Sequence, residues 1–313
     1  MSKRNKKGRD IDGVLILDKA SGQSSNNALQ EIKRLFGANK AGHTGSLDPL
    51  ASGLLPICLG QSTKVAQFLL NDDKRYFVRG KLGEISDTGD SEGQISQFGS
   101  TQAIDEAVIK DSLKNFTGVI SQIPPMFSAL KKNGTPLYKL ARKGIEVERK
   151  PREVSIYEIE FISIENDILT LEVSCSKGTY IRTLIEDIGK HLNCGGHVIE
   201  LRRIGFAHLN IDQSKTFEEI KELTLDELDS LLVGSDEMIP NLQSIHLDNT
   251  QTADIKCGRK IQCSELITPQ KVKLYDVHKR FVGIGESNTS SEVLPKRLFD
   301  GECVSGSRFV NGC

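Results

Sequence analysis

The run Lys40–Gly53 most constrains what this chain can fold into, because it contains Pro49 and three glycines within fourteen residues. Such a run disfavours a regular helix or a central strand, so the backbone must turn here and approach something closely. Asp48 is the only acidic residue of the run and follows His43 and two hydroxyl residues. A tight loop can present this carboxylate toward a substrate. The alternative is an ordinary Asp-Pro turn, in which the carboxylate accepts hydrogen bonds from nearby backbone amides.

Regular elements are predicted on both sides of this loop. Val14–Leu17 is a continuous apolar run, which is typical of a buried strand. The residues after it predict a helix that Ser24 or Ser25 caps and that Gly37 ends in the left-handed conformation. From Tyr76 onward the pattern has a period of two, which predicts a half-buried strand with Tyr76 on its more apolar face.

The middle of the chain predicts a strand pair and two connections. The runs Val154–Ile164 and Leu169–Cys175 have strand patterns and are joined by a turn near residues 166–167. Ile104–Phe116 predicts a helix. The acidic, turn-rich segment Glu84–Gly93 fails the pattern of a calcium-binding loop, so we interpret it as a solvated connection.

A further helix is predicted from Ile181 to Leu192, with Thr179 as its cap. Tyr180 and Arg182 then lie in its first turn. Because a cation at that end opposes the helix dipole, Arg182 requires a nearby anion.

Charge is distributed unevenly along a chain whose formal net charge is only −1. A basic arm occupies residues 1–10, and the proline- and glycine-rich segment Ile123–Arg152 is strongly basic. That segment contains Lys131, Lys132, Lys139, Arg142, Lys143, Arg149, Lys150 and Arg152. Long irregular excursions of this kind are usually functional. Two basic patches on an otherwise acidic chain indicate phosphate contacts, with an ordinary solvated surface as the alternative.

Several classes of protein are disfavoured by the sequence. No apolar run reaches the length of a membrane span, and no apolar signal region follows the basic start, so we expect a cytoplasmic protein. The seven cysteines have irregular spacings and include no Cys-x-x-Cys pair, which argues against a disulfide framework or a zinc ribbon. His191, Cys194 and His197 supply three potential metal ligands, but a structural zinc site needs a fourth and none is evident.

The loop around Asp48 closely resembles the catalytic motif of the TruB family of tRNA pseudouridine synthases. The resemblance continues, in order and spacing, through the segments Gly13–Lys19, Leu55–Gly60, Asp73–Tyr76, Ile123–Lys131, Cys175–Thr183 and His197–Arg203. Such ordered agreement is far more specific than a single short motif. The chain departs from the family pattern at Ala20 and Phe127, where proline and tyrosine are frequent.

The resemblance implies an α+β pseudouridine synthase fold, with a central mixed, largely antiparallel sheet flanked by helices and a small β-rich C-terminal PUA-like domain. We therefore expect a catalytic domain over residues 11–243, containing an RNA-clasping insertion at about 123–152, and an RNA-binding domain over residues 244–313. The implied reaction converts uridine 55 in the T loop of tRNA to pseudouridine. It requires no cofactor, metal, membrane or obligatory protein partner. No role is assigned to the tail Cys303–Cys313.

The resemblance also implies roles for individual residues. Asp48 would be the nucleophile and Arg182 its ion-pair partner, while Tyr76 would stack on the extruded uracil and is a possible proton acceptor. His43 would fill the space that the base leaves or hold the displaced stack, and Tyr180 and Leu201 would line the pocket. Further substrate contacts are expected from Lys19, Lys139, Arg142 and Lys143. Without the resemblance, Tyr76, Tyr180 and Leu201 would be interpreted as core residues.

Two other functions remain open from the residues alone. Ser46 lies between His43 and Asp48, which are the residue types of a hydrolase triad, but the chain has no Gly-x-Ser-x-Gly elbow there. The stronger alternative is a protein that binds or folds RNA without catalysis. Asp48 separates the two, because binding would tolerate its loss and isomerisation would not.

Overall fold

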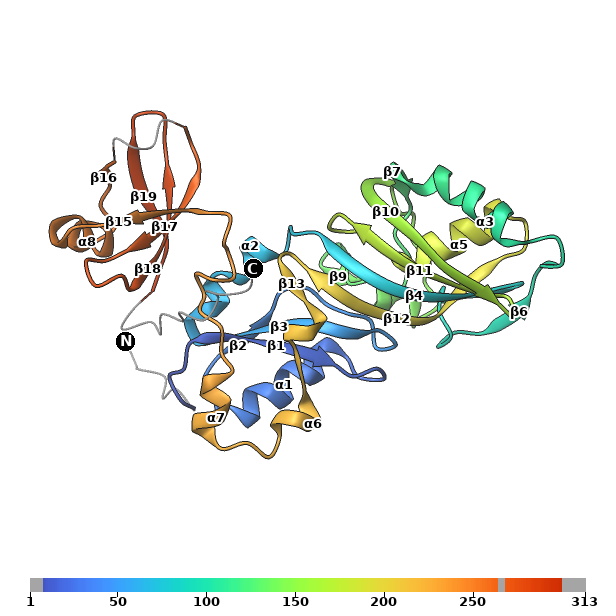
Figure 1. Cartoon of the computed structure of the whole chain (residues 1–313), viewed down its shortest axis with the longest axis horizontal. Helices are drawn as coiled ribbons and strands as arrows, with labels where there is room; N and C mark the ends of the chain where they lie inside the picture. The colour runs from blue at the N-terminus through green and yellow to red at the C-terminus, as the bar shows by residue number, and fades with distance from the viewer. Residues whose placement is uncertain (1–7, 264–267, 300–313) are drawn as a thin grey trace.

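A computed structural model describes residues 8–263 and 268–299 of the chain (Figure 1). Most of the predicted basic arm and the whole tail 303–313 therefore lie outside the described residues. Within the described part, no helix is both long and apolar enough to cross a membrane.

The larger part of the molecule is built on a ten-stranded sheet (Figure 1). Its main path runs β14 (Lys215–Thr216), β1 (Gly13–Lys19), β3 (Ser52–Leu59), β12 (Gly196–Phe206), β4 (Lys74–Leu82), β11 (Ile168–Cys175), β10 (Arg152–Glu165) and β7 (Gly118–Gln122). Strand β2 (Ala41–His43) pairs with β3, and β13 (Leu209–Asn210) pairs with β12. The β1–β14 and β3–β12 pairs are parallel and the others are antiparallel. The mixed, largely antiparallel sheet is confirmed.

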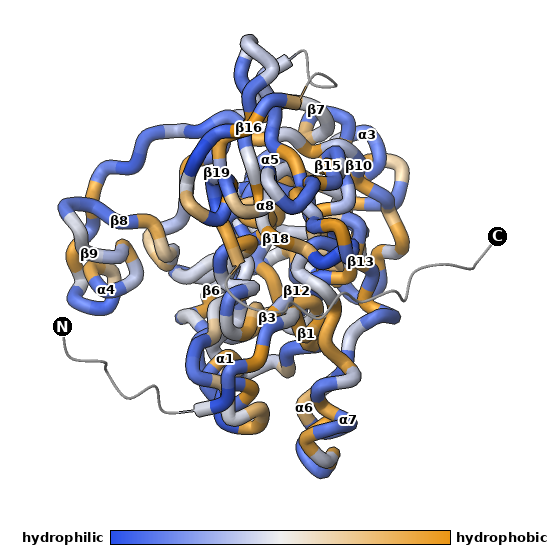
Figure 2. Tube along the Cα trace, turned by 90° about the vertical axis from the view of Figure 1, so that its left-hand side faces the viewer, coloured by the Kyte–Doolittle hydropathy of each residue, from blue (hydrophilic) through white to orange (hydrophobic). Residues whose placement is uncertain are grey.

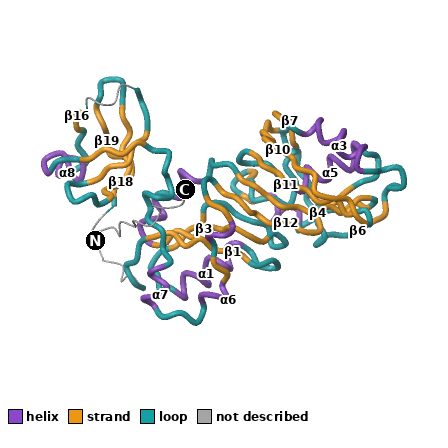
Figure 3. The backbone as a smooth tube through the Cα atoms, in the orientation of Figure 1, coloured by secondary structure: helices purple, strands orange, loops and turns teal. Residues whose placement is uncertain are grey.

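Helices cover one face of this sheet at two places. Figures 1 and 3 show α1 (Ser25–Leu35), α6 (Phe217–Ile220) and α7 (Leu225–Ser230) beside β1 and β3. Helices α3 (Glu106–Leu113) and α5 (Ile181–His191) lie toward the other end. The apolar side chains between sheet and helices form one core, to which β1 contributes Leu15 and Leu17. Because side chains alternate along a strand, Val14 and Ile16 point to the opposite face, where they belong to a second core.

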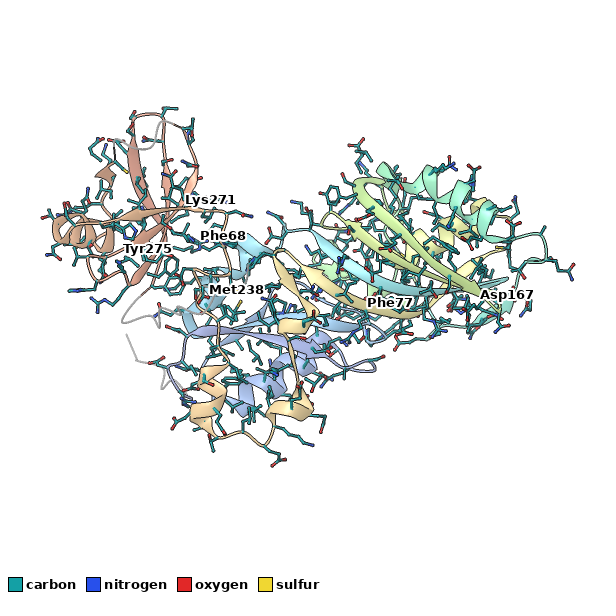
Figure 4. The ribbon with its side chains drawn as sticks, in the orientation of Figure 1. Phe68, Phe77, Asp167, Met238, Lys271 and Tyr275 are labelled. Carbon is teal, nitrogen blue, oxygen red and sulfur yellow. The ribbon has the colours of Figure 1, made fainter. Side chains whose placement is uncertain are left out.

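The second core joins the larger sheet to the C-terminal domain. This domain has a five-stranded sheet in the order β15 (Gln243–His246), β17 (Lys271–Tyr275), β18 (Phe281–Ser287), β19 (Glu292–Leu298) and β16 (Ile261–Gln262), with helix α8 (Asn249–Lys256). Phe281 and Phe299 pack in the same cluster as Val14. Figure 4 shows Lys271 facing Phe68 at this junction, where the ammonium lies 4.9 Å from the ring centroid. The C-terminal domain is therefore packed against the rest of the chain, not simply tethered to it.

Shorter elements complete the chain. They are η1 (Gly60–Lys64), α2 (Ala66–Leu69), β5 (Glu84–Ser86), β6 (Ile95–Gln97), η2 (Lys114–Phe116), β8 (Lys131–Lys132), β9 (Thr135–Pro136), α4 (Leu137–Ala141) and η3 (Ile211–Gln213). Figure 2 shows β8, β9 and α4 standing out from the body of the molecule. The predicted excursion after Ile123 is thus present, and we call residues 123–152 the basic excursion.

Local sequence signals are confirmed at most of the predicted helix ends. The Ser24 side chain caps α1 by accepting a hydrogen bond from the Asn27 amide, and Gly37 after the helix has a φ of 58°. The predicted cap of α5 is wrong. Tyr180 is the N-cap residue, and the Thr179 hydroxyl instead donates to the Ser176 carbonyl at 2.9 Å.

Candidate active site

The Asp48 loop leaves β2 at His43 and is anchored to the start of α1. The Ser25 hydroxyl accepts a hydrogen bond from the Leu47 amide at 2.7 Å and donates to the Leu47 carbonyl at 3.0 Å. Ser25 is buried, so both interactions are shielded from water. The Asp48 carbonyl then accepts a hydrogen bond from the Ala51 amide, which closes the turn before β3. The start of α1 therefore fixes the backbone before Asp48, and the turn to Ala51 fixes the backbone after it.

Lys19, at the end of β1, also holds the Asp48 loop in place. Its side chain is buried, and its ammonium donates to the carbonyls of Ala20 at 2.7 Å, Gln23 at 2.6 Å and Pro49 at 3.4 Å. Burial lowers the pKa of Lys19 to about 8, against the opposing attraction of Asp48. All three N–H groups of the ammonium are occupied by backbone, so its visible role is to hold the loop. A direct contact between Lys19 and substrate stays a prediction.

Asp48 forms an ion pair with Arg182, which comes from the first turn of α5. The distance from Arg182 Nη2 to Asp48 Oδ2 is 2.9 Å. The Asp48 side chain is 40% exposed, whereas that of Arg182 is only 4% exposed. Burial raises the pKa of Asp48, and the Arg182 guanidinium opposes that rise. Arg182 thus holds one side of the Asp48 carboxylate, and the other side is accessible to solvent.

The guanidinium of Arg182 is itself fixed by three further groups. Its Nη1 donates to the Thr88 carbonyl at 2.8 Å and lies 3.2 Å from Asp90 Oδ2. Its Nη2 donates to the Phe127 carbonyl at 2.6 Å. Because these acceptors lie on separate segments, the planar fork of Arg182 has one permitted orientation.

Asp90 is a site residue that sequence reasoning missed. The interpretation of Glu84–Gly93 as a solvated connection is wrong at this position, since Asp90 is only 3% exposed and pairs with Arg182. Its Oδ1 accepts hydrogen bonds from the Thr88 hydroxyl at 2.6 Å and the Glu92 amide at 3.1 Å. Nothing in a turn-rich acidic run distinguishes a buried carboxylate from solvated ones, because the partner lies far along the sequence.

The two departures from the family pattern involve the backbone of this site. Ala20 and Phe127 contribute carbonyl oxygens, to Lys19 and Arg182 respectively. Neither hydrogen bond depends on the side chain, so both contacts survive the change of residue.

Tyr76 lies on β4 directly opposite Arg203 of β12. Its ring is partly buried against the main core, and the Arg203 guanidinium lies close enough to influence the charge of its hydroxyl. Burial raises the pKa of Tyr76, and Arg203 opposes the rise. Sequence reasoning assigned Arg203 no role, because its position opposite Tyr76 follows from the pairing of two distant strands.

A cavity of about 630 Å³ opens beside Asp48. Four predicted site residues line it, namely His43, Asp48, Arg142 and Arg182. The other lining residues come from the start of α1, the Asp48 loop, the Asp90 turn and the basic excursion, and they are Ser24, Ser25, Asn26, Ser46, Leu47, Pro49, Thr88, Asp90, Glu92, Phe127, Ser128, Ala129 and Tyr138. The structure therefore brings the basic excursion and the carboxylate to one cavity.

The remaining predicted residues lie around this cavity, not on its walls. The backbone amide and carbonyl of Tyr180, just before α5, are both hydrogen-bonded to the side chain of Gln122. Leu201 is buried in the main core. Lys139 and Lys143 are exposed on the basic excursion. Their contacts with substrate stay predictions.

The two alternative chemistries find no support in the described residues. No group of three or more His, Cys, Asp or Glu side chains there is placed to hold a metal ion. For a hydrolase triad, Asp48 should orient His43. Instead Asp48 pairs with Arg182, and His43 Nδ1 faces the Gly45 amide at 3.4 Å.

Comparisons with family models cover most of the chain. Residues 33–181 match the model of the TruB family pseudouridylate synthase N-terminal domain. Residues 182–239 match the tRNA pseudouridylate synthase B C-terminal domain, and residues 244–299 match the model described as pseudouridine synthase II TruB, C-terminal.

Individual relatives agree along almost their full length. A tRNA pseudouridine synthase B from Shewanella sp. (strain MR-4) is 48% identical over 308 residues, which are 94% of this chain and 96% of the relative. One from Mannheimia succiniciproducens is 47% identical over 303 residues, which are 95% of this chain and 99% of the relative. Among solved structures, an H/ACA RNP bound to a substrate RNA is similar in fold, with a TM-score of 0.68 at 22% identity over 96% of this chain and 92% of that one.

Proposed function

The chain belongs to the TruB family of pseudouridine synthases, and on this premise we propose that it converts uridine 55 in the T loop of tRNA to pseudouridine. The observation that carries the proposal is the Asp48–Arg182 ion pair, which faces a cavity large enough for a nucleoside. In this reading Asp48 is the nucleophile and acts on a uridine that has been flipped out of the T loop.

The reaction breaks the bond from N1 of uracil to the ribose, turns the base and rejoins it through C5. A carboxylate can divide this difficult step into two easier ones if it is ionised and held in attack geometry. Arg182 meets both conditions, because it keeps a positive charge 2.9 Å from Asp48 and is itself fixed by two carbonyls and Asp90. The exposed side of Asp48 is then free to attack.

A base inside folded tRNA must be extruded before it can react, at a cost of a few kcal/mol. The basic excursion supports this step, because Arg142 lines the cavity together with Tyr138 and lies 5.7 Å from its ring. Stacked aromatic and guanidinium groups of this kind are typical of sites that hold unstacked bases. We propose that the basic excursion clasps the T-arm stem-loop, with Lys139 and Lys143 on phosphates and His43 in the space that the base vacates.

The division of the chain follows from the same proposal. Residues 11–243 would carry catalysis and residues 244–313 would form a PUA-like RNA-binding domain, preceded by the basic arm 1–10. The names of the relatives support tRNA as the substrate. We further propose that the enzyme works in the cytoplasm without an obligatory protein partner.

The proposal is tested by incubating the purified protein with an unmodified tRNA transcript, without added metal, and mapping pseudouridine. We expect modification at position 55 alone, and none with Asp48→Asn. The competing proposal is a protein that binds or folds tRNA without catalysis. It would leave the transcript unmodified while still shifting it in a binding assay, and that result would exclude isomerisation.

A further inference from the structure

Arg203 is a buried cation that the chemistry around Asp48 does not use. Its side chain is 1% exposed, and within the described residues no carboxylate pairs with it. Its Nε donates to the Leu54 carbonyl at 2.6 Å, and its guanidinium carbon lies 5.3 Å from the centroid of the Phe206 ring. Its Nη2 has no hydrogen-bond partner among the described residues. A buried charge that lacks an opposite charge is costly, so its presence calls for a physical reason.

The groups around Arg203 make the charge more costly still. Three neighbours are themselves basic, and they are Lys19 of β1, His43 of β2 and Lys74 of β4. Burial is the main cause that lowers the pKa of each, and the positive charge of Arg203 lowers it further. Because Arg203 is enclosed, an RNA phosphate cannot reach it. Among the described residues, the one acidic group that acts on Arg203 is the phenol of Tyr76, which lies opposite it on β4.

Tyr76 and Arg203 are held together by the sheet itself. They are directly opposite one another in the β4–β12 pairing, where side chains on the same face lie in contact. Gly53 permits this arrangement, because a Cβ there would lie 2.3 Å from the Arg203 carbonyl oxygen. Strand β3, which follows the Asp48 loop, therefore packs closely on the backbone of Arg203.

We propose that Arg203 is a positioning residue that orients the Tyr76 phenol and stabilises its deprotonated form, so that Tyr76 can accept a proton during isomerisation. The inference rests on the proposed function. Once C5 of uracil has joined the ribose, its proton passes to the phenolate oxygen and the C–H electron pair returns to the ring. N1 gains a proton in the same reaction, so the isomerisation as a whole neither consumes nor releases one.

The ionisable groups that face the Tyr76 hydroxyl set the direction of the effect. They are Arg203 of β12, Asp48 of the loop and Cys175 of β11, whose thiol has a pKa that burial raises to about 11 and is neutral near pH 7. Burial raises the pKa of Tyr76, and of these three only Arg203 lowers it. Removing Arg203 must therefore raise the pKa of Tyr76 further. At a pH below that pKa, each unit of the rise reduces the phenolate fraction about tenfold.

The test compares Arg203→Met and Arg203→Lys with the parent in single-turnover assays across pH 6–10. Methionine fills a similar volume without the unpaired charge, so we expect Arg203→Met to fold and to melt no lower than the parent. Its rate should fall on the order of tenfold near neutral pH and recover as pH rises, because the rising limb of the profile moves to higher pH. Arg203→Lys retains the charge and should shift the rising limb of the profile less than Arg203→Met does.

Arg202→Met is the control. Arg202 pairs with Asp18 and not with Tyr76, so this change should leave the rising limb where it is.

Two further results decide the proposal. In a Tyr76→Phe background, Arg203→Met should cause no additional loss, whereas independent losses in the two backgrounds would show a purely structural role. The chain has five tyrosines, so the difference in ultraviolet absorbance between each protein and its Tyr76→Phe form isolates the titration of Tyr76. An unchanged titration in Arg203→Met overturns the inference whether or not the enzyme is active. Failure of the parent to make pseudouridine would instead overturn the proposed function.

Discussion

The cavity has two walls of opposite character. One is formed by Asp48, Arg182 and Asp90, of which the last two are buried and all are ion-paired. The other is the basic excursion, from which Arg142 lines the cavity while Lys139 and Lys143 lie outside the lining. All three side chains are exposed and form no ion pair among the described residues. Compensated charges keep a fixed geometry at low cost, whereas uncompensated surface charges remain available to a polyanion. The comparison predicts that the first wall controls the rate of the chemical step and the second controls affinity for RNA.

The largest effect is expected from Asp48→Asn. The change preserves the shape of the side chain and the turn formed by the Asp48 carbonyl, but it removes the charge that attack requires. The single-turnover rate at saturating enzyme should fall by roughly a thousandfold or more. Affinity for a T-arm stem-loop should change little, because phosphate and stacking contacts supply most of it.

A binding assay and a thermal melt complete this experiment. Substantial pseudouridine formation by verified Asp48→Asn protein would refute the nucleophile. A large loss of thermal stability would show that Asp48 is mainly a turn residue.

Arg182→Lys should have the next largest effect. Lysine keeps the charge but cannot span Asp48, Asp90 and two carbonyls at once. We expect the single-turnover rate to fall on the order of a hundredfold, while the dissociation constant for tRNA changes less than about threefold. A proportional loss of affinity would mean that Arg182 binds phosphate, and the distinction between the two walls would fail.

These residues also mark what the sequence alone could predict. Local patterns were sufficient for β1, for α1 with its Ser24 cap, and for the turn at Asn166 and Asp167, whose φ values of 50° and 64° suit a tight hairpin. The pairing of Asp48 with Arg182 was available only through a family resemblance. Local sequence cannot reveal a contact between distant segments, and for the same reason Asp90 was taken for a solvated residue and Arg203 was given no role.

Asp90→Asn tests whether the buried wall acts as a unit. The Asp90 charge contributes to the raised pKa of Asp48, after burial as the main cause, so its removal should lower that pKa. The acidic limb of the pH–rate profile should therefore move to lower pH. Loss of one fixed contact to Arg182 should reduce the rate on the order of tenfold. Asp87→Asn is the matched control, because Asp87 belongs to the same turn and is exposed. Among the described residues, its carboxylate accepts a hydrogen bond only from the Gln94 amide. Equal behaviour of the two variants would show that burial of Asp90 has no consequence for catalysis.

The smallest effect on chemistry should come from the basic excursion. Replacing Lys139, Arg142 and Lys143 with glutamate should weaken tRNA binding, on the order of tenfold near 0.1 M salt, because phosphate contacts that release counterions are lost. The slope of log affinity against log salt should become shallower by about two, while the single-turnover rate at saturating enzyme stays within a few fold.

The matched control reverses three lysines that are paired with carboxylates elsewhere on the surface, namely Lys110, Lys114 and Lys221. Both triple variants change the net charge equally, so a general electrostatic effect would flatten the salt dependence of both. A loss confined to the basic excursion would locate the RNA contact on that wall. An unchanged salt slope in the variant of the basic excursion would show that this segment is only solvated surface. A large fall in the single-turnover rate of that variant at saturating enzyme would mean that Arg142 takes part in the chemistry, so that the two walls are not functionally separate.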